Sequence, residues 1–150
     1  MPMLVGVIHL PPLPGSPRSS LSISECAKRA AQDAAILAGN GYDAIVVENF
    51  GDAPFFAGKV PPITVAAMTA CAVAVRQASQ DGWLGINVMR NDAEAALSIA
   101  VAANARPAAR AARARMATRR GFAWGLAFMT PPQGTTLRSA RGALCVALAA

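Results

Sequence analysis

The chain has 150 residues, of which 54% are hydrophobic, so it can bury the core of one domain but is too short for a closed eight-stranded α/β barrel of about 250 residues. Its formal net charge of +6 comes from one end of the chain, because residues 1–105 hold eight acidic and six basic residues, whereas residues 106–150 hold eight arginines and no acidic residue. This distribution argues against a specific nucleic-acid-binding domain, whose basic residues lie on a folded surface together with a reading motif.

The N-terminal residues and the cysteines exclude further classes of protein. No basic stretch precedes a long apolar segment, and Pro11, Pro12 and Pro14 interrupt the early hydrophobic run, so we expect neither a signal peptide nor a transmembrane segment, and hence a cytoplasmic protein. The cysteines are odd in number and lack the paired spacing of a zinc site, which argues against a disulfide framework or a structural metal. We expect them to pack in the core. They are Cys26, Cys71 and Cys145.

Local sequence signals predict alternating strands and helices up to about residue 105. Strands are expected where short apolar runs occur, at residues 3–8, 44–47 and 84–86. The first helix starts at the capping box formed by Ser22 and Glu25, continues through the apolar positions of residues 27–37, and stops at the Gly-Asn-Gly sequence that follows.

Two further helices are expected after the second and third strands. One covers residues 64–78, after Pro61 and Pro62, which suit the first turn of a helix. The other is capped by Asn91 or Asp92 and runs to about residue 103. The resulting order, in which each strand is followed by a helix, predicts an α/β fold with a parallel sheet and right-handed crossovers.

The three predicted strands end in polar residues at a constant interval. His9, Glu48 and Asn87 lie 39 residues apart along the chain, which is typical of a repeating strand-plus-helix unit. Because the carboxyl ends of parallel strands meet at one edge of the sheet, we expect these three side chains to surround one shared opening.

The sequence changes character near residue 105. A fourth strand is expected soon after the third helix, but residues 106–115 repeat Ala and Arg and contain no β-branched residue, which makes them poor strand material. A short basic helix after Pro107 and an apolar strand over residues 121–128 are alternatives. We interpret residues 106–150 as a basic low-complexity tail, and two explanations stay open: disorder, or a shifted reading frame in a GC-rich gene. Such a tail can bind anionic lipid or nucleic acid nonspecifically.

Four sequence blocks over about residues 3–105 carry a resemblance to a known family. They are Val-Ile-His-Leu-Pro-Pro-Leu-Pro-Gly-Ser-Pro at residues 7–17, Val-Glu-Asn-Phe-Gly-Asp-Ala-Pro-Phe at 47–55, Ala-Ala-Met-Thr at 66–69 and Gly-Ile-Asn-Val-Met-Arg-Asn-Asp at 85–92. In these blocks the chain resembles the BtpA family, which is linked to photosystem I biogenesis in cyanobacteria. The resemblance implies part of a (β/α)8 TIM barrel of the ribulose-phosphate-binding type, namely its first three βα units, followed here by an atypical Arg/Ala-rich C-terminal segment.

His9 and Glu48 are the predicted catalytic residues. A histidine at a strand end can act as a general acid or base near neutral pH, or as a metal ligand, and the alternative is a hydrogen bond to a loop. Glu48 is the stronger candidate for acid–base chemistry or metal binding, and the alternative is an ion pair with Arg90. The sequence leaves open whether a metal is bound and whether the protein is an enzyme.

Further polar residues near the strand ends are predicted to bind a ligand. The amides of Asn49, Asn87 and Asn91 can orient a polar molecule, and Asp52 either binds a ligand or caps a turn. Arg90 can hold a phosphate or a carboxylate with two parallel hydrogen bonds. The chain contains no dinucleotide-binding fingerprint, P-loop or nucleophile elbow, so the sequence identifies no cofactor.

Three functions stay open at this point. The first is a BtpA-like role in photosystem I biogenesis or stability, in which the protein binds or transforms a small polar or phosphorylated molecule. Its partners would then be photosystem I assembly components, and it would lie at the periphery of a photosynthetic membrane. The second is a metabolic barrel enzyme acting on a sugar-like or nucleoside-like compound outside photosynthesis. The third is an inactive truncated fragment, because three barrel strands leave an unpaired edge, which also predicts homo-oligomers or aggregates.

Overall fold

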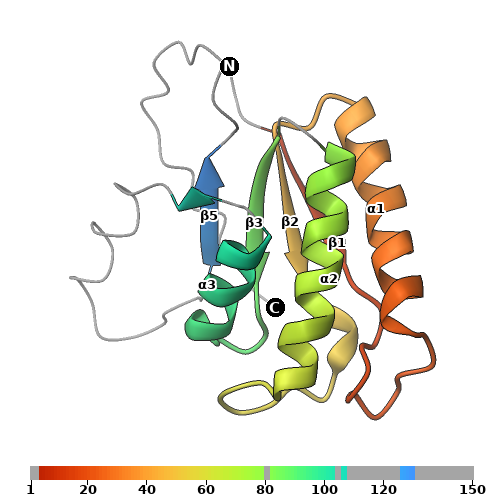
Figure 1. Ribbon diagram of the computed structural model, residues 1–150, viewed down its shortest axis with the longest axis vertical. Helices are drawn as coiled ribbons and strands as arrows, with labels where there is room; N and C mark the ends of the chain where they lie inside the picture. Colours follow the sequence, from red (N-terminus) through yellow and green to blue (C-terminus); the bar gives the residue numbers. More distant parts are fainter. Residues whose placement is uncertain (1–3, 80–81, 104–105, 108–125, 131–150) are drawn as a thin grey trace.

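The computed structural model describes residues 4–79, 82–103, 106–107 and 126–130, and within them strands alternate with helices in the predicted order (Figure 1). The elements are β1 (Val5–His9), α1 (Ile23–Gly39), β2 (Ala44–Glu48), the 3-10 helix η1 (Phe50–Asp52), α2 (Pro62–Ser79), β3 (Trp83–Asn87), α3 (Ala93–Ala102), β4 (Arg106–Pro107) and β5 (Leu126–Thr130). The three strands and three helices predicted before residue 105 are therefore confirmed. Each of the three strands also includes the polar residue at its end.

Side-chain caps define where the helices begin. At the start of α1, the Glu25 backbone N–H donates to Ser22 Oγ at 3.3 Å, and the Ser22 N–H donates to Glu25 Oε2 at 2.8 Å, which is the predicted capping box. At the start of α3, Asp92 Oδ1 accepts a hydrogen bond from the Ala95 N–H at 3.0 Å. Asp92, one of the two predicted caps, is thus the N-cap of α3.

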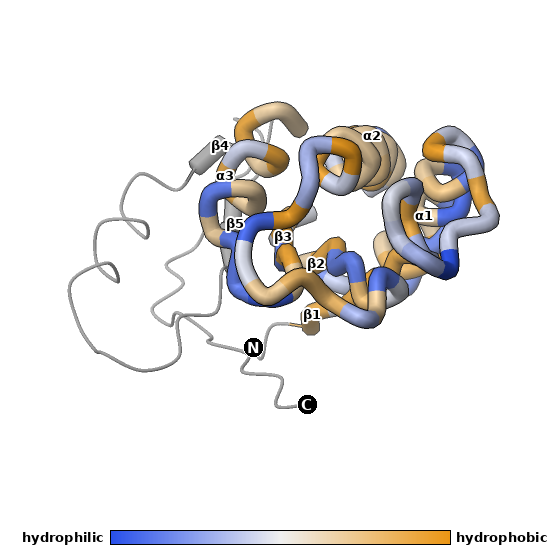
Figure 2. Tube along the Cα trace, turned by 90° about the horizontal axis from the view of Figure 1, so that it is seen from below, coloured by the Kyte–Doolittle hydropathy of each residue, from blue (hydrophilic) through white to orange (hydrophobic). Residues whose placement is uncertain are grey.

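The sheet and the helices form two layers. Strands β1, β2 and β3 are parallel neighbours, and α1, α2 and α3 all lie against the same face of this sheet (Figures 1 and 2). Ile8, Val47 and Ile86 are buried on that face and form part of the core. Because side chains alternate along a strand, the next residue of each strand points to the opposite face.

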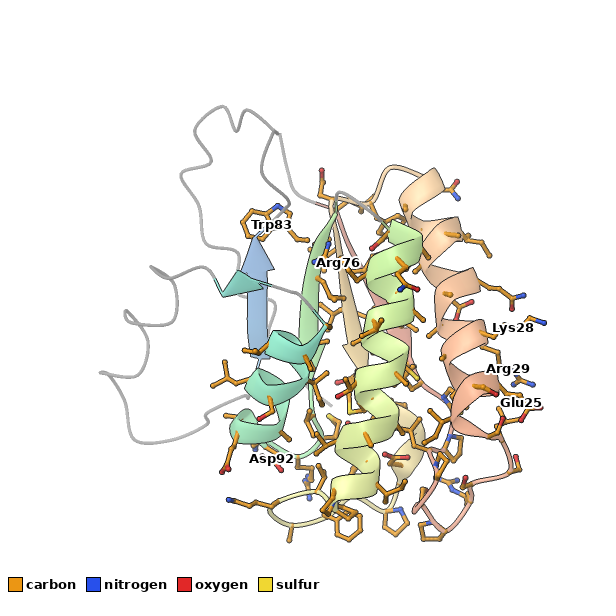
Figure 3. The ribbon with its side chains drawn as sticks, viewed as in Figure 1. Glu25, Lys28, Arg29, Arg76, Trp83 and Asp92 are labelled. Atoms are coloured by element: carbon orange, nitrogen blue, oxygen red, sulfur yellow. The ribbon has the colours of Figure 1, made fainter. Side chains whose placement is uncertain are left out.

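Helix α1 has a polar outer side and an apolar inner side. Glu25, Lys28 and Arg29 lie on the outer side of α1 and point away from the sheet (Figure 3), whereas Ala30 and Ala34 on the inner side are buried. Such a division of apolar and polar residues at helical spacing explains why α1 forms against the sheet.

Beyond α3, the structure departs from a continued parallel sheet. Strand β5 occupies the place next to β3 and runs antiparallel to it, whereas a fourth barrel strand would run parallel. Strand β4 has only two residues, one of them a proline that cannot donate to a ladder. The poor strand character predicted for residues 106–115 stays a prediction, because residues 108–115 lie outside the described residues. The strand predicted over residues 121–128 overlaps β5 at 126–128.

Several predictions fall outside the described residues. They are the basic helix after Pro107, the first part of the strand over residues 121–128, and the tail from residue 131 onward. The division of the chain near residue 105 stays a prediction.

Two of the three cysteines lie in the core. Cys26 and Cys71 are buried free thiols, so the prediction that they pack in the interior is confirmed, while Cys145 lies outside the described residues. Burial raises the pKa of the Cys71 thiol to about 12. In the described part of the chain, no helix has both the length and the hydropathy that a membrane span requires.

Candidate functional site

The last residues of β1, β2 and β3 form one row across the sheet. His9 lies opposite Glu48 and Glu48 opposite Asn87 in the strand pairing, so all three side chains project from the same face. His9 Nε2 is 3.1 Å from Glu48 Oε2, and Asn87 Nδ2 donates to Glu48 Oε1 at 2.5 Å. The predicted juxtaposition of these residues is therefore confirmed, while their roles stay predictions.

Exposure differs sharply between the members of this row. The Glu48 side chain is 10% exposed and has a partner on each carboxylate oxygen, whereas the His9 side chain is 52% exposed. A buried carboxylate with two partners is well suited to hold a neighbour in place. The imidazole is the group of the two that a molecule arriving at the strand ends can reach.

The ion pair of Glu48 differs from the alternative that the sequence suggested. Its partner among the described side chains is His9, and Arg90 is exposed in the connection between β3 and α3. Asn91, also exposed there, has a φ of 66°, in the left-handed region that asparagine enters more readily than most residues. Arg90 and Asn91 thus lie close in sequence to Asn87 and face solvent, while their predicted contact with a ligand stays a prediction.

Asn49 and Asp52 connect the three loops at the carboxyl ends of the strands. Asp52 Oδ1 accepts from the Leu13 N–H at 2.7 Å, and Asp52 Oδ2 accepts from Asn49 Nδ2 at 3.0 Å. Asn49 Oδ1 in turn accepts from the Met89 N–H at 2.8 Å. Both side chains are buried and hold these loops together, a structural role that the sequence suggested for Asp52 only as the cap of a turn and did not suggest for Asn49. Their predicted role in binding a ligand is untested.

Asp92 extends this loop network. Its Oδ2 accepts from the Val60 N–H at 2.8 Å, while its Oδ1 caps α3. Figure 3 shows Asp92 at the lower end of the fold, where the parallel strands finish, and Trp83 at the upper end, where β3 starts. The loop that follows β2 is therefore tied to the loops on both sides of it.

Phe50 belongs to the site although sequence reasoning assigned it no role. It directly follows the Glu48-Asn49 pair and stacks on the His9 imidazole, with ring centroids 4.6 Å apart and planes inclined by 21°. Phe55 lies beside it at 6.3 Å in a tilted arrangement. The signal that could have identified Phe50 was an aromatic residue one position beyond two polar strand-end residues, within a block of family resemblance.

The described residues contain no cluster of three or more His, Cys, Asp and Glu side chains arranged for a metal ion. His9 and Glu48 together contribute an imidazole nitrogen and a carboxylate. An imidazole and a carboxylate in contact can pass a proton between them or to a bound molecule.

Comparison with known sequences identifies the family. The profile of the BtpA family matches residues 2–115. The chain belongs to the BtpA family. The match reaches beyond residue 105, where the resemblance was expected to stop, and includes the Ala/Arg-rich residues up to 115. All four blocks that carried the resemblance lie within it.

Curated relatives of this BtpA family member come from several branches of life. The photosystem I biogenesis protein BtpA of Synechocystis sp. is 47% identical over 97 residues, which are 65% of this chain and 33% of that protein. An uncharacterized protein of Archaeoglobus fulgidus is 49% identical over 102 residues, 68% of this chain and 40% of the relative. An uncharacterized mitochondrial protein of Caenorhabditis elegans is 36% identical over 67 residues, 45% of this chain and 24% of the relative.

The chain spans 40% or less of the length of these three relatives. No solved structure matches it. The activity, substrates and partners of a whole BtpA family protein are therefore matters of proposal for this chain.

Proposed function

We propose that this chain supplies the first three βα units of a (β/α)8 TIM barrel of the ribulose-phosphate-binding type, and that it binds or transforms a small polar or phosphorylated molecule at the ends of β1, β2 and β3. The observation that carries the proposal is the row of His9, Glu48 and Asn87 at the carboxyl ends of three parallel strands. Barrels of this kind place their ligand and catalytic groups at that end.

In the proposed site, His9 exchanges a proton or a hydrogen bond with the ligand. The carboxylate of Glu48 accepts the Nε2–H of the ring, which leaves Nδ1 as the acceptor of the neutral imidazole. When the ring takes up a proton, the same carboxylate stabilises the positive charge. Asn87 holds the second carboxylate oxygen, so Glu48 acts here as a positioning residue rather than as the acid or base itself.

The exposed residues after β3 complete the proposal. Arg90 and Asn91 would hold the charged or polar part of the ligand, since a guanidinium binds a phosphate or carboxylate with two hydrogen bonds. Asn49 and Asp52 would act mainly by keeping the loops in place, because their carboxylate and amide oxygens accept hydrogen bonds from backbone or side-chain donors within the loops.

The relatives favour a small-molecule function over one restricted to photosynthesis. Photosystem I biogenesis is named for the Synechocystis relative alone among the three compared above. The relatives from Archaeoglobus fulgidus and Caenorhabditis elegans, whose names mention no photosystem, share the matched region at 49% and 36% identity. A role in photosystem I biogenesis remains the second candidate, supported by the 47% identity to the cyanobacterial protein.

A ligand screen that observes His9 directly tests the proposal. The chain has a single histidine, so its imidazole signals can be followed by NMR without assignment of other residues while sugars, sugar phosphates and nucleosides are added. We expect a compound that shifts these signals and that binds about tenfold more weakly to the His9→Gln variant, the loss expected for one hydrogen bond to a charged or polar ligand.

Lys28→Gln, on the outer face of α1, is the matched control and should bind like the unmodified chain. Equal binding by the His9→Gln variant would contradict the proposed site. A chain that folds but binds no member of the panel would favour the assembly role, and a chain without a cooperative unfolding transition would favour the inactive fragment.

A further inference from the structure

We propose that Phe50 is a positioning residue that holds the His9 imidazole in one orientation, in cooperation with Glu48. The inference rests on the proposed role of His9 in the site. Phe50 was not among the residues predicted to take part in function, and its contact with His9 is an aromatic stack between the start of η1 and the end of β1.

The two partners of His9 restrain different motions of the ring. Glu48 holds one atom at the edge of the imidazole, with 3.1 Å between Nε2 and Oε2, but a single edge contact still allows the ring to rotate about that line. The Phe50 ring covers one face of the imidazole at 4.6 Å with an inclination of only 21°. A contact on the edge and a contact on the face together define the plane of the ring, and therefore the direction of Nδ1.

Phe50 is not a residue of the hydrophobic core. The residue is 47% exposed, so hydrophobic burial alone does not explain a phenylalanine at this position. Phe56, in the same connection between β2 and α2, is similarly exposed at 44%. Among the ring contacts of the described residues, however, Phe50 and not Phe56 contacts His9. The two phenylalanines thus provide a test residue and a matched control.

The backbone next to Phe50 is fixed against the loop that follows His9. The Gly51 N–H donates to the Leu10 carbonyl oxygen at 3.1 Å. A β-carbon at position 51 would lie 2.6 Å from each of three backbone atoms, namely Leu10 O, Pro11 C and Pro12 N. The two loops approach so closely that only glycine fits between them.

Asp52 strengthens the same connection from the other side of Gly51. It is buried and accepts the Leu13 N–H at 2.7 Å. Phe50 therefore starts a short helix whose next two residues both bind the loop after β1, so the backbone that carries the Phe50 ring is held in place beside His9. Restricting a reactive group in this way favours catalysis by reducing the orientations that must be searched.

The test compares Phe50→Leu, Phe50→Tyr and Phe56→Leu with the unmodified chain. The NMR signals of the single imidazole should carry a ring-current displacement in the unmodified chain that disappears in Phe50→Leu, returns in Phe50→Tyr and persists in Phe56→Leu. The thermal unfolding midpoint serves to show that Phe50→Leu remains folded. The ring-current displacement reports the stack itself, so the reactivity of His9 is needed to test whether the stack positions the imidazole.

Acylation of His9 by diethyl pyrocarbonate gives a second measurement. Removing the ring that covers the imidazole should raise the rate of acylation about two- to tenfold in Phe50→Leu, the range that corresponds to the strength of an aromatic pair. In Phe50→Tyr and Phe56→Leu, the rate of acylation should remain near that of the unmodified chain. Unchanged imidazole signals and an unchanged rate in folded Phe50→Leu would overturn the inference. That outcome differs from failure of the proposed function, which is measured by ligand binding to His9→Gln.

Discussion

Replacing Asp52 by alanine distinguishes its scaffold role from a role in ligand binding. In the folded chain, the Asp52 carboxylate accepts hydrogen bonds from the Leu13 N–H at 2.7 Å and from Asn49 Nδ2 at 3.0 Å. Leu13 and Asn49 are both almost completely buried, and Asp52 itself is 6% exposed. Asp52→Ala would leave two buried donors without their acceptor.

The expected cost follows from these two donors. Leaving one buried hydrogen-bonding group without a partner costs about 1–3 kcal/mol, so two donors give about 2–6 kcal/mol. We expect the lower part of this range, about 2–3 kcal/mol, because removing the carboxylate makes space in which water can reach the donors. The loss should also loosen the loop that begins with Phe50.

Urea denaturation followed by circular dichroism measures this free energy of unfolding. Asp33→Ala is the control, because Asp33 is exposed on α1 and a surface substitution of this kind changes stability by at most about 0.5 kcal/mol. A ligand-binding role alone predicts that Asp52→Ala unfolds like Asp33→Ala. If the two variants had the same free energy of unfolding, the scaffold role of Asp52 would be refuted.

Four further predictions concern the loops, the core and the first helix. Gly51→Ala should destabilise the fold by about 1–3 kcal/mol through overpacking, measured by urea denaturation, whereas Gly58→Ala, where a β-carbon meets no atom within 4 Å, should cost less than half as much. Burial raises the pKa of Cys71 to about 12, so iodoacetamide at pH 8 should not alkylate this thiol until denaturant is added, as peptide mapping can show. Rapid labelling of Cys71 in the native chain would contradict its burial. Ser22→Ala should cost about 1 kcal/mol by removing the N-cap of α1. Hydrogen bonds from Ser22 lower the pKa of Glu25. The contribution of the ionised Glu25 carboxylate to the stability of the fold is therefore present above its ordinary pKa, and it is lost as the pH falls through the lowered value. Glu25→Gln should therefore make unfolding less dependent on pH in that acid range, and an unchanged pH profile would argue against the capping box.

The repeat of 39 residues explains why the sequence predicted the central row correctly. Each strand is followed by a helix and two connections of the same total length, so parallel pairing places each residue opposite the one 39 positions later. His9, Glu48 and Asn87 obey this rule, and their meeting follows from the spacing once the strands are known to be parallel. The family, too, was recognisable from the blocks around the strand ends.

The partners of Asn49, Asp52 and Phe50 could not be predicted in the same way. These residues lie just beyond a strand, where no repeating geometry applies, and their contacts are with residues such as Leu13 and Met89 in other loops. A polar side chain near a strand end can face a ligand or accept a backbone N–H, and the sequence is the same in both cases. The different burial of His9 and Glu48 could not be predicted either, because it depends on how the loops close over the ends of the strands.

The sequence by itself determined the alternation of strands and helices, because apolar periodicity and capping residues are local properties of the chain. It also determined which residues end the parallel strands. Only the tertiary structure decided that Glu48 is buried between His9 and Asn87, that Phe50 covers the imidazole, and that β5 runs antiparallel beside β3. These features depend on contacts between segments far apart along the chain, which form only when the loops and the sheet are packed together.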